Sequence, residues 1–434
     1  MQGGLIVGAC ILLGNITGFF RVAVTAYLLG THAGADALAV ALGPVDTLNS
    51  VIVNTMLFAF VPMLLLWQGP DRGALFARAA RVFICIFAGL SVLTALFAPQ
   101  WIAVLGPGLA APERAQAVTL LRWLAPSTLF GASASTYSAL LYTERRFLVP
   151  NLYQTCLNIA TITGALLLRS TFGINGFALG YSTGSAAQLC LTWYFTRSLR
   201  RAPRAAWKPP IADVLLKPGM FLLYAGLISG NLIVTRVYAT HAGPGMAAAF
   251  DYCMRCVSVV LAYLVYPVAS TLVPEIARLR GANQTSKAYL LIDNSVALMA
   301  VAAVGSCALG VLLRAPVIAL LFERGNFTAE STRLVATVFL GIAPSLIGWA
   351  MLDLIARCFF AMNRPQLPVL AAFVPVTVNL VVTAVLHAKG MLASPAALGL
   401  GASIGLFLGF AVLFTAIHLR KKTAALEASL VEAN

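Results

Sequence analysis

The chain has 434 residues, 60% of them hydrophobic and 10% charged, with a mean hydropathy of +0.90 and a net charge of +15. This composition excludes an ordinary soluble globular domain, because such domains have about 25% charged residues. It also argues against a membrane β-barrel, whose strands would alternate in hydrophobicity over short segments, whereas the longest apolar runs here exceed 20 residues and contain Gly and Pro. The composition therefore predicts an all-α polytopic membrane protein.

Twelve apolar segments are long enough to cross a bilayer, which takes about 20 residues of helix. We expect the first to be a transmembrane helix and not a cleaved signal, since it has no basic leader and no convincing cleavage site. The predicted segments are residues 5–28, 37–67, 76–98, 114–142, 148–168, 175–196, 213–237, 244–275, 286–313, 330–361, 367–386 and 396–418.

Basic residues concentrate after the even-numbered segments. The connections there carry 17 of the 29 Lys and Arg residues, and the connections after odd-numbered segments carry five. The positive-inside rule then predicts that both termini and the basic stretch at 197–210 are cytoplasmic. Because this topology accounts for most of the positive charge, no nucleic-acid partner is predicted.

Cysteine and histidine positions give no sign of a metal or catalytic centre. The eight cysteines lie within apolar segments, and the four histidines are scattered near segment ends. No disulfide framework, zinc spacing, catalytic triad or phosphate-binding loop is present in the sequence. We therefore expect a transporter and not an enzyme, with no cofactor and no metal, and leave coupling to an ion or to the membrane potential open.

The two halves of the sequence repeat one pattern. The tetrapeptide Thr-His-Ala-Gly occurs at 31–34 and 240–243, and Ala-Pro-Ser at 125–127 returns 218 residues later, at 343–345. Six segments per half give both halves the same orientation, which predicts two six-helix lobes related by a pseudo-two-fold axis along the membrane normal. The predicted domains are an N-terminal lobe (1–196), a basic cytoplasmic linker (197–212), a C-terminal lobe (213–419) and a cytoplasmic tail (420–434).

Charged side chains inside the apolar segments point to a functional cavity, because each costs roughly 2.5–3.5 kcal/mol near a helix centre unless it faces water or a partner. Asp251 precedes Arg255 by four residues and Asp353 precedes Arg357 by four, spacings that predict ion pairs on one helix face. Arg21 has no acidic residue three or four positions away. We therefore expect Arg21 to need an anion or water.

Polar side chains accompany these charges in the first two segments of each half. With Arg21 they predict a hydrated, positively charged cavity between the halves, which suits a phosphate or diphosphate that a guanidinium can engage bidentately. The polar residues at depth are Asn15, Thr17, Asn49, Asn54, Asn231 and Thr235.

Several short motifs are similar to those of the MurJ/MviN lipid II flippases, within the wider MOP (multidrug/oligosaccharidyl-lipid/polysaccharide) exporter superfamily. In the first half they are residues 18–21 (GFFR), 34–37 (GADA) and 59–62 (AFVP). In the second half they are residues 272–274 (LVP) and 321–328 (LFERGNFT). The resemblance extends over essentially the whole chain.

The resemblance implies a V-shaped bundle that moves an undecaprenyl-pyrophosphate-linked glycan from the inner to the outer leaflet by alternating access. The cavity arginines of the family correspond to Arg21 and Arg255. The sequence departs from the family at Asn15, at residues 47–50 (TLNS) and at Ser258, where charged residues are usual, and it has no counterpart of two further C-terminal helices. The predicted substrate-binding residues are Arg21, Arg255, Asn15, Asp36, Asn49, Arg236 and Asp251.

The first functional hypothesis is thus a flippase of the bacterial inner membrane for lipid II or a related lipid-linked oligosaccharide. The alternative is a cation-coupled exporter of small amphiphiles, similar to the MATE exporters, in which Asp46, Asp251 and Asp353 would carry the coupling. A third hypothesis is a glycan-assembly enzyme or a non-transporting partner, which would need a large polar outer loop. The expected partners are the lipid-linked diphosphate glycan and the bilayer, with the chain acting as a monomer and glycan-assembly enzymes as candidate neighbours.

Overall fold

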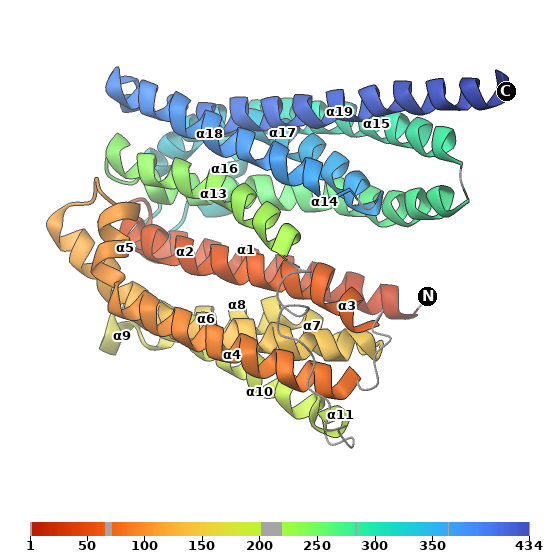
Figure 1. Ribbon diagram of the computed structural model, residues 1–434. Helices are drawn as coiled ribbons and strands as arrows, with labels where there is room; N and C mark the ends of the chain where they lie inside the picture. Colours follow the sequence, from red (N-terminus) through yellow and green to blue (C-terminus); the bar gives the residue numbers. More distant parts are fainter. Residues whose placement is uncertain (1, 66–71, 201–218, 283, 363, 434) are drawn as a thin grey trace. The chain divides into compact units, whose positions relative to one another are not determined.

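A computed structural model describes residues 2–65, 72–200, 219–282, 284–362 and 364–433 (Figure 1). Within these ranges the chain forms helices and no strands, and a helix occupies every one of the twelve predicted segments. Nine of the described helices are long and apolar enough to cross a membrane. The other three predicted segments correspond to α6, to α7 with α8, and to α10. The prediction of an all-α polytopic membrane protein is confirmed.

The chain divides into two compact units. Unit 1 runs as far as Ser229 and also includes residues 322–328, and unit 2 comprises residues 230–321 and 329–434. The boundary therefore falls within α13, and most of the predicted linker, from residue 201 onward, lies outside the described residues.

Unit 1 is built around α6, which packs against α2, α4 and α10, while α8 packs against α10 and α1. Its helices are α1 (Gln2–Leu29), α2 (Ala33–Thr55), the π-helical turn η1 (Met56–Phe60), α3 (Val61–Leu65), α4 (Arg72–Leu96), α5 (Ala98–Leu105), α6 (Ala111–Thr143), α7 (Leu148–Asn151), α8 (Tyr153–Leu167), α9 (Arg169–Phe172), α10 (Asn175–Phe195) and α11 (Arg197–Arg200).

Small residues allow the helices of unit 1 to approach closely. A Cβ placed on Gly164 of α8 would lie 2.5 Å from the carbonyl oxygen of Gly176 and 2.6 Å from the Cα of Gly180, both on α10. Such contacts replace the hydrophobic effect as the source of helix association in a bilayer, where lipid is as apolar as the side chains. The close approach holds α10 in place next to α8, and both helices contribute to the polar site described below.

Unit 2 is built around α17, which packs against α14, α15 and α19. Its helices are α13 (Gly219–Ala242, from residue 230), α14 (Met246–Gly281), α15 (Thr285–Leu312), α16 (Arg314–Phe322), α17 (Ala329–Ala361), α18 (Gln366–Ala388), the short turns η2 (Met391–Ala393) and η3 (Pro395–Ala397), and α19 (Leu400–Ala433). The residues predicted as a separate tail continue α19 as far as Ala433.

The central helices of the two units carry the internal repeat. Helices α6 and α17 each have 33 residues, and their first residues are 218 positions apart. Each has a proline in its interior, Pro126 and Pro344, at the same offset. The repeat found in the sequence therefore corresponds to equivalent helices.

Residues 322–328 join α16 to α17 but pack within unit 1, against the end of α1. The backbone N–H of Asn326 donates to the carbonyl of Tyr27 (2.9 Å) and its side-chain amide donates to the carbonyl of Leu28 (2.7 Å). Asn326 thus satisfies two carbonyls that the last turn of a helix leaves unbonded. Gly30 has a φ of +58°, and a Cβ there would lie 2.2 Å from the Asn326 carbonyl oxygen, so this contact requires glycine.

Candidate substrate site

Arg21 of α1 faces Asp46 of α2 inside unit 1. The Arg21 Nη2 and Asp46 Oδ2 atoms are 3.9 Å apart, and the two side chains are 12% and 40% exposed. No acidic residue lies within one turn of Arg21 on its own helix, as the sequence shows, and the counter-ion comes from the next helix. The distance exceeds that of a charge-assisted hydrogen bond, which is about 2.7–2.9 Å. The pair is therefore a loose one.

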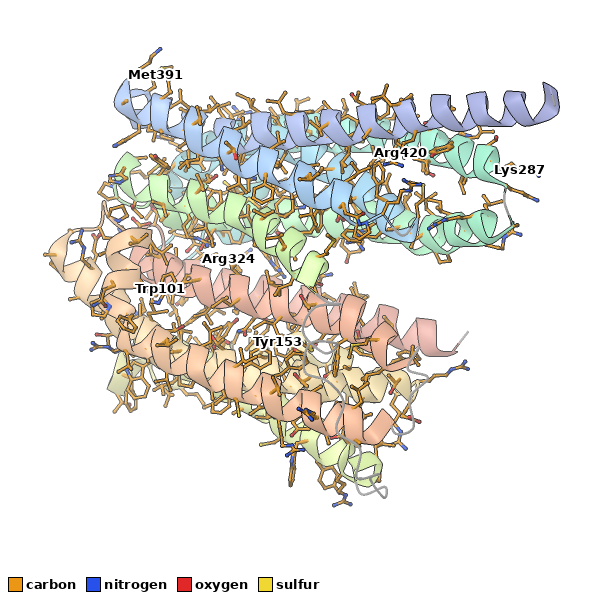
Figure 2. The ribbon with its side chains drawn as sticks, viewed as in Figure 1. Trp101, Tyr153, Lys287, Arg324, Met391 and Arg420 are labelled. Atoms are coloured by element: carbon orange, nitrogen blue, oxygen red, sulfur yellow. The ribbon has the colours of Figure 1, made fainter. Side chains whose placement is uncertain are left out.

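Two tyrosines complete the surroundings of this pair. The Tyr181 hydroxyl on α10 donates to Asp46 Oδ1. The Arg21 guanidinium carbon lies 5.8 Å from the centre of the Tyr181 ring, within the range of a cation–π contact. Tyr153, on α8, is midway along the unit 1 bundle (Figure 2). Helices α1, α2, α8 and α10 thus all contribute side chains at this level.

Several polar atoms at this site are buried and have no hydrogen-bond partner among the described residues. They are Arg21 Nη1, both amide atoms of Asn49 and the Tyr153 hydroxyl oxygen. A Cβ placed on Gly131 of α6 would lie 3.1 Å from the Tyr153 oxygen and 3.2 Å from Asn49 Oδ1, so these two groups converge on the same glycine. Buried polar groups in folded proteins are nearly always hydrogen-bonded. The convergence of unpaired polar groups therefore marks a place that a polar ligand or water can occupy.

Two other predicted site residues lie away from this level. Asp36 is 3% exposed and belongs to the first turn of α2, about 15 Å along the helix from Asp46. Asn15 is half-buried on α1, six residues before Arg21. The structure therefore brings Arg21 and Asn49 to one site together with Asp46, and it does not bring Asp36 there.

Unit 2 holds a second arginine–aspartate pair between its first two helices. Arg236 of α13 donates through Nε (3.1 Å) and Nη2 (2.7 Å) to the same oxygen of Asp251 on α14. The Arg236 guanidinium also lies 5.8 Å from the centre of the Phe250 ring. Arg255 is half-buried one turn after Asp251 on α14. Its predicted pairing with Asp251 remains a prediction.

The second predicted i, i+4 pair forms. Arg357 Nε donates to Asp353 Oδ2 at 2.9 Å along α17, with side chains 26% and 23% exposed. This confirms the interpretation that these two charges neutralise each other on one helix face.

A buried amide network lies beside the Arg236 pair in unit 2. The side-chain amide of Asn379 on α18 donates to the carbonyl and side-chain oxygens of Asn231 (2.8 and 2.9 Å) and to the Thr235 hydroxyl (2.9 Å). Its oxygen accepts from the Thr383 hydroxyl at 2.9 Å. Unlike Asn49 in unit 1, this amide is fully bonded.

Sequence reasoning missed Tyr153 and Tyr181, because a tyrosine within an apolar run also suits an ordinary membrane helix. Within the described residues, no group of three or more His, Cys, Asp and Glu side chains is arranged to hold a metal ion. The unit 1 site contains the Arg21 guanidinium, the Asn49 amide and the Tyr153 phenol, all of which can donate hydrogen bonds. Such a set suits an anionic oxygen ligand.

A family model described as lipid II flippase MurJ matches residues 25–433. The chain belongs to this family. Among similar MurJ proteins, the probable lipid II flippase of Rhizobium meliloti is 26% identical over 86% of this chain and 72% of its own length. That of Vibrio cholerae is 23% identical over 97% of this chain and 83% of its own length.

Solved structures of similar proteins give the same fold. A lipid II flippase MurJ in an inward closed conformation matches with a TM-score of 0.83 at 19% identity, over 95% of this chain and 87% of that chain. An inward-facing multidrug resistance MATE family transporter of the MOP superfamily matches with a TM-score of 0.77 at 11% identity, over 94% and 95%. The MurJ fold of this chain is thus shared with the MATE transporters, at lower identity.

Proposed function

We propose that this chain is a flippase that moves an undecaprenyl-diphosphate-linked glycan, lipid II or a closely related lipid-linked oligosaccharide, across the cytoplasmic membrane. Membership of the MurJ family supports the reaction class. The observation that carries the proposal for this chain is the unit 1 site. There a buried nitrogen of Arg21 and the polar groups of Asn49 and Tyr153 have no hydrogen-bond partner in the part of the chain that the structure describes.

The chemistry of that site fits a diphosphate. An arginine presents planar, paired N–H donors that match two phosphate oxygens, and its charge offsets part of the charge that a diphosphate brings into the membrane. The Asn49 amide and the Tyr153 hydroxyl supply neutral donors beside it. Arg255 remains the predicted second arginine for the same group.

Asp46 can serve as the counter-ion of Arg21 when no substrate is bound. A lone guanidinium inside a membrane protein needs a counter-ion, and Asp46 at 3.9 Å supplies one without a tight bond. A diphosphate carries more negative charge than a carboxylate, so it can displace Asp46 from Arg21. Departure of the substrate would then restore the original pair, and the site would be reset without any covalent step.

The predicted topology places both termini and the 197–210 stretch in the cytoplasm. Labelling of single cysteines in a variant without the eight native cysteines tests this arrangement. A cysteine in place of Ala205 should react from the outside only after the membrane is permeabilised, and reaction in intact cells would reverse the topology.

The transport reaction itself is tested with the purified chain in vesicles. We expect fluorescent lipid II added to one leaflet to become accessible in the other, with no extrusion of a cationic dye such as ethidium. Dye extrusion that depends on Asp46, Asp251 and Asp353 and no lipid II movement would replace the flippase with the cation-coupled exporter.

A further inference from the structure

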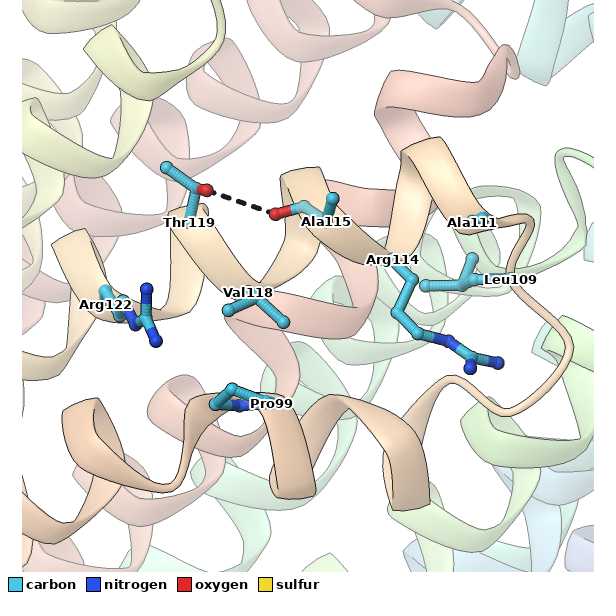
Figure 3. Close-up of a pocket in the computed structure, with 8 residues that line it drawn as sticks. All are labelled: Pro99, Leu109, Ala111, Arg114, Ala115, Val118, Thr119 and Arg122. Carbon is cyan, nitrogen blue, oxygen red and sulfur yellow. Dashed lines mark hydrogen bonds between the residues drawn. The ribbon is translucent and has the colours of Figure 1, made fainter.

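A groove lies between α5 and the first three turns of α6 (Figure 3), and α5 is at one end of unit 1 (Figure 1). It has a volume of about 580 Å³ and contains two cationic side chains and no acidic one. Figure 3 shows Arg114, Val118 and Arg122 following one another along α6, with Pro99 of α5 across from them. The lining residues are Pro99, Leu109, Ala111, Arg114, Ala115, Val118, Thr119 and Arg122.

The two arginines of the groove differ in their bonding. Arg114 donates to the carbonyl of Pro107 at 2.9 Å and so closes the loop that precedes α6. Arg122 is exposed and makes no hydrogen bond, ion pair or ring contact with the part of the chain that the structure describes. The nearest acidic residue in the sequence, Glu113, accepts from the backbone of Ala110 and does not line the groove. Arg122 therefore has no counter-ion from the described chain.

The position of Arg122 along α6 places it at the edge of the hydrocarbon layer. Helix α6 has 33 residues, about 50 Å, and Arg145 and Arg146 follow its end. About 20 residues of helix cross the hydrocarbon core. A stretch of that length that ends at Thr143 begins next to Arg122. Lipid phosphates lie at this level of a bilayer.

The side chains around the groove have the character of a membrane interface. Helix α5 buries Ala98, Ile102 and Leu105 against the unit and exposes apolar side chains on its other face. Tryptophan is enriched where hydrocarbon meets headgroups. The exposed apolar residues there, with their exposed fractions, are Leu96 (66%), Phe97 (50%), Trp101 (45%), Val104 (66%) and Trp123 (42%).

We propose that this groove binds the phosphate headgroup of an anionic glycerophospholipid, with Arg122 as the phosphate ligand. Its guanidinium supplies the paired donors, and Val118 and Pro99 supply an apolar floor for the glycerol and upper acyl chain. Arg114, about 12 Å farther along the helix, adds positive potential where a zwitterionic lipid would place its ammonium group. The groove therefore favours a lipid of net negative charge. This proposal does not depend on the flippase reaction.

A reporter inside the groove tests it directly. In the full chain without its native cysteines, Ala115→Cys places a thiol in the groove lining, and Ala103→Cys places one on the exposed part of α5 outside it. Maleimide labelling is followed in mixed micelles of phosphatidylglycerol or phosphatidylcholine. We expect phosphatidylglycerol to slow labelling at position 115 by about fivefold relative to phosphatidylcholine, and to have no such effect at position 103.

Substitutions then assign the effect to Arg122. Arg122→Gln should abolish the protection at position 115, and Arg122→Lys, which keeps the charge and loses the planar fork, should retain part of it. Arg197→Gln, an exposed arginine on α11 that stacks on Tyr194 at 4.1 Å, should leave it unchanged. As a measurement that needs no cysteine, native mass spectrometry of the Arg122→Gln chain should show about tenfold weaker binding of one phosphatidylglycerol molecule.

Four outcomes would overturn the proposal. Equal protection by phosphatidylcholine would mean that the groove binds lipid through apolar contacts and does not select for charge. Protection that survives Arg122→Gln would mean that other residues bind the lipid. Protection by undecaprenyl diphosphate but not by phosphatidylglycerol would make the groove a site for the transported lipid. Protection by inorganic phosphate alone would point to a free anion and not to a lipid.

Discussion

The two units each place an arginine–aspartate pair between their first two helices, but they complete it differently. In unit 2, Arg236 uses two nitrogens on one oxygen of Asp251, at 2.7 and 3.1 Å. In unit 1, Arg21 and Asp46 are 3.9 Å apart, and Arg21 Nη1 is buried and has no hydrogen-bond partner in the described chain. Both arginines lie 5.8 Å from an aromatic ring, so the ring contact does not distinguish them.

The buried amides follow the same division. Asn379 in unit 2 donates to Asn231 and Thr235 and accepts from Thr383. Asn49 in unit 1 is 3% exposed, and neither of its amide atoms has a hydrogen-bond partner within the described ranges. A satisfied network stabilises a fold, whereas unsatisfied donors cost stability unless something binds them. The contrast indicates that the Arg236–Asp251 pair and the Asn379 network stabilise the fold of unit 2, and that Arg21 and Asn49 of unit 1 are available to a ligand.

The largest expected effect is that of Arg21→Ala on transport. We expect lipid II translocation per folded molecule to fall by about 100-fold or more, because the bare guanidinium nitrogen is the strongest donor of the unit 1 site. Arg21→Lys should retain part of the rate. Vesicle assays, with folding checked by thermal denaturation, measure this, and a wild-type rate from well-folded Arg21→Ala protein would contradict the role of unit 1.

Arg236→Ala should lower stability and leave transport nearly unchanged, the reverse of what we expect for Arg21→Ala. Losing the two bonds to Asp251 should lower the free energy of unfolding by about 2 kcal/mol, while transport per folded molecule stays within about threefold of wild type. Denaturation in detergent and the vesicle assay together give both numbers. Loss of transport at unchanged stability would indicate instead that Arg236 and Asp251 bind substrate, as the sequence predicts.

The two amides allow a matched comparison of stability. Asn379→Ala should lower the unfolding free energy by about 2 kcal/mol, since Asn231, Thr235 and Thr383 lose their bonds to this amide. Asn49→Ala should change it by less than about 0.5 kcal/mol, because Asn49 has no protein bond to lose. Equal losses from the two substitutions would mean that Asn49 is bonded within the fold.

Asp46→Asn should have a small effect of the opposite sign. Removing the counter-ion of Arg21 should strengthen binding of undecaprenyl diphosphate by about fivefold, because the ligand no longer competes with a carboxylate. Asp353→Asn, in the tight pair on α17, is the matched control and should leave this affinity unchanged. Weaker binding after Asp46→Asn would show that Asp46 supports the site and does not compete for Arg21.

Much of the fold could be predicted from the sequence, because the length of an apolar run determines whether a helix can cross a bilayer. The repeat at an offset of 218 residues corresponds to the central helices α6 and α17. The pair of Asp353 and Arg357 was predictable as well, since four residues on one helix fix which side chains are neighbours.

The composition of the site could be predicted only in part. Arg21 and Asn49 were found as polar residues at depth, but the contact of Arg21 with Asp46 depends on how α1 and α2 are rotated about their axes, which no spacing along one helix encodes. Tyr153 and Tyr181 come from two further helices for the same reason. Asp36 was selected through a motif, and its place in the first turn of α2 sets it apart from the site.

The most direct test is whether Arg21 recognises the diphosphate itself. Affinities of the purified chain for undecaprenyl diphosphate and for undecaprenol, which has the same tail without phosphates, separate headgroup binding from tail binding. We predict that wild type binds the diphosphate at least about tenfold more tightly than the alcohol, and that Arg21→Gln removes most of this difference while Arg236→Gln keeps it. Unchanged discrimination in folded Arg21→Gln protein would contradict the account.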